Sequence, residues 1–422
     1  MTVKKISPKK KLALKLYSWY RANEKKVHPL NYIFWECTLR CNLNCIHCGS
    51  DCMKDSLIND MPKEDFLKAL DEITPDIIPN KTMIVLTGGE PVLRKDISEI
   101  GIELYKRGFP WGIVSNGMGL QSPMIKSLLD SGIRAITISL DGLEDSHNWL
   151  RGNKNSFKNA ANAITILSKI EGLRYDVVTC ANQKNINELP ELYNLLMKLG
   201  LKEWRIFTIF PIGRAKENEL LQLKPTEFKG LFDFIEKVRK EGRIKLNYGC
   251  EGFLGDYEGR VRDNFFFCRA GVNVASILVD GSISACPNLR DNFIQGNIYK
   301  DNFKDVWQNK YSMYRNRSWT KTGICGDCDF FNYCEGNGMH LRNEKTGELL
   351  FCHLKRIEEG EKLPAGTNKI IQRRESAWGI VVVCQRPDFV YREIAHDPAP
   401  VAVEFVQRYG GLSVFSRRVI CL

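Results

Sequence analysis

The sequence predicts an α/β fold: a partial (β/α)6 barrel of the TIM type, followed by a small cysteine-rich domain. Between residues 32 and 240, short apolar runs typical of buried parallel strands alternate with amphipathic helical patterns. Six such units are fewer than the eight of a closed barrel. After residue 240 the helical periodicity fades, and turns and cysteines multiply. The loop after the first strand has cysteines rather than the glycine pattern of a dinucleotide-binding fold.

The pattern divides the chain into four segments. Residues 1–30 are expected to form a basic helix and a linker, 31–240 the barrel, 241–360 the cysteine-rich domain, and 361–422 an unassigned tail. The expected barrel strands are Tyr32–Cys37, Met83–Thr87, Trp111–Ser115, Ala135–Leu140, Tyr175–Cys180 and Arg205–Phe210. The first helix is expected near Pro62, with Phe66, Leu67, Leu70 and Ile73 on one face. Asp280-Gly281 predicts a hairpin that joins Ser276–Val279 to Ser282–Ala285. In the tail, Ile380–Cys384 and Val401–Val406 are candidate strands.

The composition is that of an ordinary globular protein. The chain has 422 residues, of which 43% are hydrophobic and 26% charged, and its formal net charge is +11. Lysines crowd the N-terminus and later charges are mixed, which favours a solvated surface over nucleic-acid binding. No secretory signal and no apolar run of about 20 residues is visible, so we expect a cytoplasmic protein without a membrane span. In that reducing compartment the fifteen cysteines are expected to be metal ligands or free thiols.

Three cysteines, Cys41, Cys45 and Cys48, follow the first strand at spacings of four and three residues. Three thiolates on a four-iron cluster leave one iron without a protein ligand, whereas an electron carrier uses four cysteines. Zinc also takes four ligands. A zinc site with His47, Cys37 or Cys52 as a further ligand therefore stays open, although Cys37 is expected to be a buried free thiol within its strand.

Further motifs follow at the carboxyl ends of the next strands, the side where barrel enzymes place their chemistry. They are Gly88-Gly89-Glu90-Pro91, Ser115-Asn116-Gly117, Ser139-Leu140-Asp141-Gly142 and Arg151-Gly152. Together with the three cysteines, this order of motifs resembles the radical S-adenosylmethionine (radical SAM) superfamily.

The resemblance implies a [4Fe–4S] cluster on Cys41, Cys45 and Cys48 whose open iron chelates S-adenosylmethionine. Gly88, Gly89 and Pro91 would shape the turn beside the methionyl group, and Glu90 would accept hydrogen bonds from its ammonium. Asn116, Ser139 and Asp141 would meet the ribose or the carboxylate. Arg151 would pair with the carboxylate, its alternative being a surface ion pair. The family cleaves S-adenosylmethionine reductively to a 5′-deoxyadenosyl radical, which takes a hydrogen atom from the substrate.

The second set of cysteines resembles the SPASM domain, an extension that binds auxiliary iron–sulfur clusters. The resemblance implies one auxiliary [4Fe–4S] cluster on Cys325, Cys328, Cys334 and Cys352, and another on Cys250, Cys268 and Cys286. The family has a further cysteine where this chain has Gly338, so the latter cluster would keep an open iron, borrow His340 or be absent. A zinc ribbon is the alternative for the region. Pro211-Ile212-Gly213-Arg214-Ala215 also matches a segment often found before this domain.

The resemblance implies an oxidoreductase that modifies a ribosomally made peptide or protein. It also implies an electron donor such as flavodoxin or ferredoxin. Because only some 30 residues precede the barrel, a separate leader-peptide-binding protein or the tail at 361–422 would have to bind a leader peptide. A small-molecule substrate is an alternative. A sulfatase-maturing enzyme is disfavoured by Pro287, where those members have an acidic residue. An electron-transfer protein is disfavoured because it needs no S-adenosylmethionine.

Overall fold

The computed structural model describes residues 6–362 and, beyond them, the backbone of five short strands between residues 372 and 406. The chain divides into two compact units, residues 1–360 and 361–422. All residues that the sequence predicts as ligands of a cluster or of S-adenosylmethionine lie in the first unit.

A ten-stranded sheet forms the centre of the first unit, in the order β10-β9-β8-β1-β2-β3-β4-β5-β6-β7. All neighbouring strands from β8 to β7 are parallel. The barrel strands are β1 (Tyr32–Thr38), β2 (Met83–Gly88), β3 (Trp111–Ser115), β4 (Ala135–Ser139), β5 (Arg174–Ala181), β6 (Glu203–Thr208) and β7 (Lys245–Tyr248). Because parallel strands end on the same side, the motifs that follow β1 to β4 share one edge of the barrel.

The predicted α/β class is confirmed, and each of the six predicted strands matches one of β1 to β6 within two residues at either end. β7 was not predicted. It has four residues, of which only Leu246 and Tyr248 are buried. Such a short strand at the edge of the sheet has too little alternation to be recognised in the sequence.

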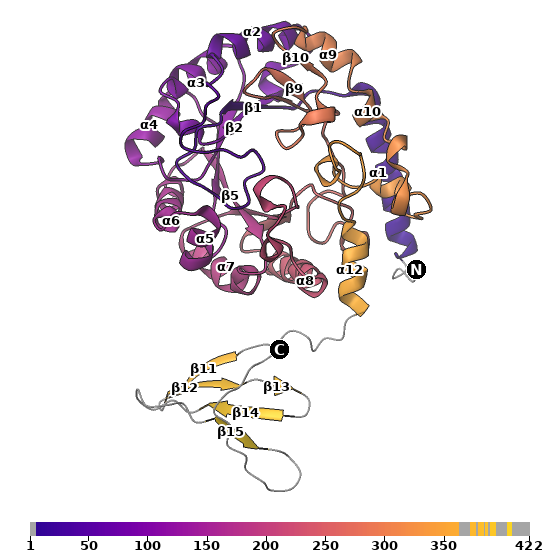
Figure 1. Cartoon of the computed structure of the whole chain (residues 1–422). Helices are drawn as coiled ribbons and strands as arrows, with labels where there is room; N and C mark the ends of the chain where they lie inside the picture. Colours follow the sequence, from indigo (N-terminus) through magenta and orange to yellow (C-terminus); the bar gives the residue numbers. More distant parts are fainter. Residues whose placement is uncertain are drawn as a thin grey trace. The chain divides into compact units, whose positions relative to one another are not determined.

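Helices surround the strands (Figure 1). They are α2 (Lys63–Ile73), α3 (Ile97–Lys106), α4 (Ser122–Asp130), α5 (Glu144–Arg151), α6 (Ser156–Leu167), α7 (Leu189–Lys198) and α8 (Pro225–Glu241). The predicted apolar face of α2 is confirmed, since Phe66, Leu67, Leu70 and Ile73 are all buried. Phe66 stacks on Trp35 of β1 with ring centroids 4.1 Å apart. A buried side chain of this size contributes about 1.5–3 kcal/mol, which fixes the helix against the strand.

The cysteine-rich region continues the barrel sheet. β8 (Val274–Ile277) and β9 (Ser282–Ser284) form the predicted hairpin, and β10 (Gly296–Asn297) pairs with β9. β8 pairs in parallel with β1, and Ile277 and Ile283 belong to the same buried core as Trp35. Residues 241–360 therefore pack as part of the first unit. The helices of this region are α9 (Phe303–Asn309), α10 (Ser312–Arg315), α11 (Phe331–Cys334) and α12 (His353–Lys362).

The basic N-terminal segment forms α1 (Pro8–Val27), which lies beside the cysteine-rich region (Figure 1). Arg21 is buried and donates hydrogen bonds of 2.8 Å to the backbone oxygens of Asn332 and Tyr333. Lys25 pairs with Glu335 at 2.6 Å. Part of the N-terminal positive charge thus anchors this helix beside Cys334.

In the second unit the structure describes β11 (Gln372–Ser376), β12 (Gly379–Val383), β13 (Gln385–Arg386), β14 (Phe389–Glu393) and β15 (Val403–Val406). β11 pairs with β12, and β14 pairs with both β13 and β15, all antiparallel. The two predicted strands of the tail correspond to β12 and β15. Among the described residues, none of the helices combines the length and the apolar character that crossing a membrane requires.

Candidate functional site

The loop that carries Cys41, Cys45 and Cys48 leaves the end of β1 and is fastened to two other segments. Cys41 donates its backbone hydrogen bond to Met53 at 3.0 Å, and Ile46 donates to Leu150 of α5, also at 3.0 Å. Cys41 and Cys45 are buried, and Cys48 is partly buried. The three sulfurs are therefore presented by a loop whose backbone is held on both sides.

The three thiols differ in their acidity. Burial raises the pKa of Cys41 to about 11, and it also raises the pKa of Cys45. A hydrogen bond with Cys52 lowers the pKa of Cys48 to about 5. Because iron binds thiolates, Cys41 and Cys45 release protons when a cluster is assembled. Cys37 is fully buried in β1, and burial raises its pKa to about 12, as expected of a free thiol in the core.

The glycines after β2 lie against the cysteine loop itself. A side-chain carbon on Gly88 would come within 2.9 Å of Glu36 Cγ and closer still to the Thr38 oxygen. On Gly89 it would come within 2.6 Å of the Arg40 carbonyl carbon. Gly89 also donates a 2.7 Å hydrogen bond to Thr38. Only glycine lets the two segments approach this closely, and the buried Pro91 then ends the turn.

Glu90 joins the end of β2 to the end of β3. It is buried, and it accepts hydrogen bonds of 2.8 Å from the Ser115 hydroxyl and from the backbone of Asn116. Burial raises the pKa of Glu90 to about 7. The Asn116 side chain donates to Asn42 at 2.8 Å and to Cys41 Sγ at 3.8 Å. The motifs after β2 and β3 thus position the cysteine loop in addition to any contact with a ligand.

Arg151 and Asp141 form a buried ion pair at the end of β4, where Ser139 also lies. Arg151 donates to Asp141 at 2.6 Å and to Cys45 Sγ at 3.7 Å. Because Arg151 is only 8% exposed, the interpretation of this residue as part of a surface ion pair is wrong. Asp141 is fully buried, and its other oxygen accepts a 2.8 Å hydrogen bond from the backbone of Cys180. Burial would raise the pKa of Asp141, but the charge of Arg151 holds it below its usual range. Asp141 therefore holds the positively charged guanidinium of Arg151 beside the sulfur of Cys45.

Sequence models of two families match the chain. One, of the radical SAM superfamily, matches residues 35–196, and the other, of an iron–sulfur cluster-binding domain (SPASM), matches residues 268–329. The first contains the three loop cysteines and all the strand-end residues described above. The chain belongs to the radical SAM superfamily. It also carries a C-terminal SPASM domain, and its cofactors are [4Fe–4S] clusters and S-adenosylmethionine.

Proteins similar to this chain in sequence carry the names of enzymes with different substrates. AdoMet-dependent heme synthase of Methanosarcina barkeri is 24% identical over 325 residues, which cover 72% of this chain and 90% of that protein. Mycofactocin maturase MftC of Mycolicibacterium smegmatis is 27% identical over 310 residues, which cover 72% and 77%.

Two solved structures share the fold. Streptococcus suis SuiB bound to S-adenosylmethionine has a TM-score of 0.61 at 17% identity, with 81% of this chain and 80% of that one covered. The protein anSMEcpe with bound AdoMet and Cp18Cys peptide has a TM-score of 0.61 at 20% identity, with 79% and 95% covered. These matches confirm the predicted partial barrel of the radical SAM family.

The structure brings the cysteines of the SPASM region together in two sets. The first auxiliary set is Cys250, Cys268 and Cys286. Burial raises the pKa of Cys286 to about 12, and the nearby thiols of Cys250 and Cys268 raise it further. The Cys268 sulfur accepts a 3.5 Å hydrogen bond from the backbone of Met339. The three thiols are thus close enough to affect one another's pKa, and the Cys268 sulfur lies beside the segment that contains Gly338.

The second auxiliary set is Cys325, Cys328, Cys334 and Cys352. Burial raises the pKa of Cys334 to about 12, and Cys352 and Cys325 add to the shift. The backbone of Asn337 donates to Cys334 Sγ at 3.1 Å, and Arg342 donates to Cys325 Sγ at 3.9 Å. Such hydrogen bonds to sulfur stabilise thiolates and tune a bound cluster. Cys328 is close enough to Cys325 to raise its pKa, and the assignment of all four cysteines to one cluster stays a prediction.

Among the described residues, no three Cys, His, Asp or Glu side chains converge closely enough to hold a single metal ion. The thiolates of a four-iron cluster bind different irons, so a cluster does not require that convergence. The donors present, three or four cysteines in each set, suit iron–sulfur clusters.

The structure also reveals a contact that sequence reasoning missed. Arg214, in the segment 211–215 after β6, donates to the Cys52 oxygen at 2.7 Å and pairs with Asp51 at 3.1 Å. Its backbone donates to the Cys48 oxygen at 3.3 Å. The sequence places this segment before the SPASM domain, and in the fold its Arg214 holds the far end of the cysteine loop.

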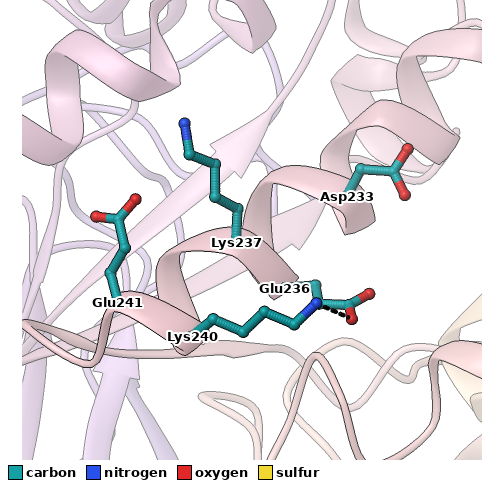
Figure 2. A pocket seen from close by; sticks show the side chains of 5 residues that line it. All are labelled: Asp233, Glu236, Lys237, Lys240 and Glu241. Carbon is teal, nitrogen blue, oxygen red and sulfur yellow. Dashed lines mark ion pairs between the residues drawn. The ribbon is translucent and has the colours of Figure 1, made fainter.

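A hollow on the outer helix α8 has a different character (Figure 2). It is lined by Asp233, Glu236, Lys237, Lys240 and Glu241. Lys240 and Glu236 form an ion pair of 2.8 Å one helical turn apart, a surface interaction worth about 0.3–0.5 kcal/mol. None of these side chains belongs to the predicted site, so the hollow is a solvated helix face.

Proposed function

We propose that the chain is a radical SAM enzyme that abstracts hydrogen from a side chain of a ribosomally made peptide or protein. The observation that carries the proposal is the joining of the cysteine loop to the ends of β2, β3 and β4. Cys45 receives a hydrogen bond from Arg151, Cys41 receives one from Asn116, and Glu90 is buried beside them. A cysteine loop joined in this way to three strand ends suits a site that binds S-adenosylmethionine, which an electron carrier does not need.

In this proposal each residue has a positioning task. Cys41, Cys45 and Cys48 hold the cluster, and the Gly88–Gly89 turn brings the end of β2 against their loop. Glu90 accepts hydrogen bonds from the Ser115 hydroxyl and from the backbones of Asn116 and Val92, and a carboxylate has a further acceptor site for one more donor. An ammonium group of S-adenosylmethionine would supply that donor and compensate the buried charge. The bound cofactors supply one-electron cleavage of the sulfonium, which leaves 5′-deoxyadenosine after hydrogen abstraction.

The peptide substrate is supported by relatives. Mycofactocin maturase MftC is similar in sequence, and the solved structures of similar fold include SuiB bound to precursor peptide SuiA and anSMEcpe with bound peptide. An electron donor of the flavodoxin or ferredoxin type and a separate leader-binding protein belong to the same proposal.

A second candidate substrate is a porphyrin. AdoMet-dependent heme synthase and Fe-coproporphyrin III synthase of Methanosarcina barkeri are each 24% identical to the chain, and the matches cover 90% and 82% of those proteins. Their names support a small-molecule substrate as strongly as MftC supports a peptide.

Deuterium transfer distinguishes the two candidates. A candidate precursor peptide, labelled with deuterated amino acids, is incubated anaerobically with the reduced holoenzyme and S-adenosylmethionine. The proposal predicts deuterium in 5′-deoxyadenosine and a mass change in the peptide. Consumption of an iron porphyrin, with no label transferred from the peptide, would refute the peptide assignment.

A further inference from the structure

The first auxiliary set, Cys250, Cys268 and Cys286, offers three thiolates, and the position that supplies a fourth in the family is Gly338. The backbone there has no room for a side chain. A carbon on Gly338 would lie 2.5 Å from the Glu251 oxygen, to which the Gly338 backbone donates a 2.8 Å hydrogen bond. A cysteine at this position would break that backbone contact, so the local fold itself excludes the usual ligand.

The side chain of His340 lies where a side chain on Gly338 would point. The same added carbon would come 2.7 Å from His340 Cε1 and 3.1 Å from its Nδ1. The imidazole packs against Phe210 with ring centroids 4.8 Å apart, and His340 is only 8% exposed. An imidazole edge thus occupies the direction of the missing thiolate.

One nitrogen of this imidazole has no partner. His340 Nε2 is buried, and no described residue forms a hydrogen bond with it. Glu251, the nearby carboxylate, is already bound by the Thr208 backbone at 3.0 Å and by the hydroxyl groups of Thr208 and Tyr248. A buried nitrogen without a partner is costly, and an ion or cluster that binds it removes the cost.

The neighbouring backbone connects His340 to the sulfurs. Met339 lies between Gly338 and His340, and its N–H donates to Cys268 Sγ at 3.5 Å. Cys250 is the residue before Glu251, whose oxygen holds Gly338. The Cys268 sulfur and the backbone next to Cys250 therefore both contact the short segment that carries the imidazole.

We propose that His340 is the fourth ligand of the cluster on Cys250, Cys268 and Cys286, bound through Nε2. The inference rests on the proposed assignment of that cluster. Imidazole is a known ligand of iron in iron–sulfur clusters, and replacing thiolate with imidazole raises the reduction potential. A cluster with this ligand would be closed, and it would accept an electron more readily than an all-cysteine cluster.

Pulsed electron paramagnetic resonance tests the ligand directly. In a variant with Cys41→Ala, Cys45→Ala and Cys48→Ala, only auxiliary clusters remain. The protein is prepared with natural histidine and with ¹⁵N-histidine, reconstituted with iron and sulfide, and reduced without S-adenosylmethionine. We expect a strong nitrogen coupling that changes with the isotope. Auxiliary clusters without that coupling would overturn the inference.

Variants identify the histidine. His340→Ala should lose the coupling, and His340→Cys should lose it while the iron content is kept. His28→Ala, at the C-cap of α1 beside Gln308, should leave it unchanged. Persistence of the coupling in His340→Cys would refute the assignment. Formation of 5′-deoxyadenosine by the wild-type enzyme, measured separately, tests the proposed function and does not depend on this ligand.

Discussion

Replacing Gly89 with alanine places a methyl group against the backbone of the cysteine loop. The new carbon would lie 2.6 Å from the carbonyl carbon of Arg40, whereas ordinary contacts of this kind begin at 3.4 Å. Neither partner is a flexible side-chain end, so one of the two backbones must move by at least about 0.8 Å, the difference between those distances, and by more to clear the Arg40 carbonyl oxygen, which would lie closer still. The movement separates the end of β2 from the loop that carries Cys41.

The expected effect follows from that displacement. Overpacking of this kind costs about 1–3 kcal/mol. Loss of the hydrogen bond from Gly89 to Thr38 adds about 1 kcal/mol. A misplacement of about 1 Å between reacting groups lowers a rate by about 100-fold. We therefore expect the variant to form 5′-deoxyadenosine about 100-fold more slowly and to have a lower thermal midpoint.

Gly230→Ala is the matched control. Gly230 lies in α8, and no atom outside its own helix lies within 4 Å of the added carbon. Alanine there should be neutral or stabilise the helix by about 1 kcal/mol, with normal turnover. Turnover is measured as 5′-deoxyadenosine in anaerobic assays at equal iron content. Wild-type rate and stability in Gly89→Ala would refute the role assigned to the glycine turn.

Three further predictions concern the same site. Arg151→Met or Asp141→Asn alone leaves a buried charge unpaired and should lower the free energy of unfolding by about 3–5 kcal/mol. The double variant should recover part of this loss, and chemical denaturation of all four proteins in a double-mutant cycle measures it. S-adenosylmethionine should bind about tenfold more weakly for each pH unit below about 7, because Glu90 becomes protonated. In Glu90→Gln the dissociation constant, measured by equilibrium binding, should not change with pH in this range. Cys37→Ala should lower stability by about 1 kcal/mol and leave the iron content unchanged, and a loss of iron would contradict its assignment as a free thiol.

The barrel strands could be predicted from the sequence because each is a short, buried run bounded by polar turns. Their order followed from the rule that strands joined by helices pair in parallel. The link between β8 and β1 could not be predicted, since no local pattern says which strand a distant hairpin joins. It is this pairing that makes the SPASM region part of the barrel unit.

The site residues could be named from motifs, but their partners could not. The sequence predicts that Arg151 meets a ligand carboxylate, and it gives no sign of the contacts with Asp141 and Cys45 that the fold adds. The helix that carries it, α5, is short and polar, so its pattern was not recognised. The glycine turn was expected to approach the methionyl group, and the structure shows its close contact with the cysteine loop. Motifs predict which residues form the site, but they do not predict the contacts between segments that are distant in sequence.

The loop of Cys41, Cys45 and Cys48 is proposed to support reductive cleavage of S-adenosylmethionine. The most direct test is formation of 5′-deoxyadenosine by the anaerobically reconstituted, reduced protein, with Cys45→Ala beside it. We expect product from the wild type and none above background from the variant. No product from a wild-type protein with its full complement of iron, or equal product from Cys45→Ala, would contradict it.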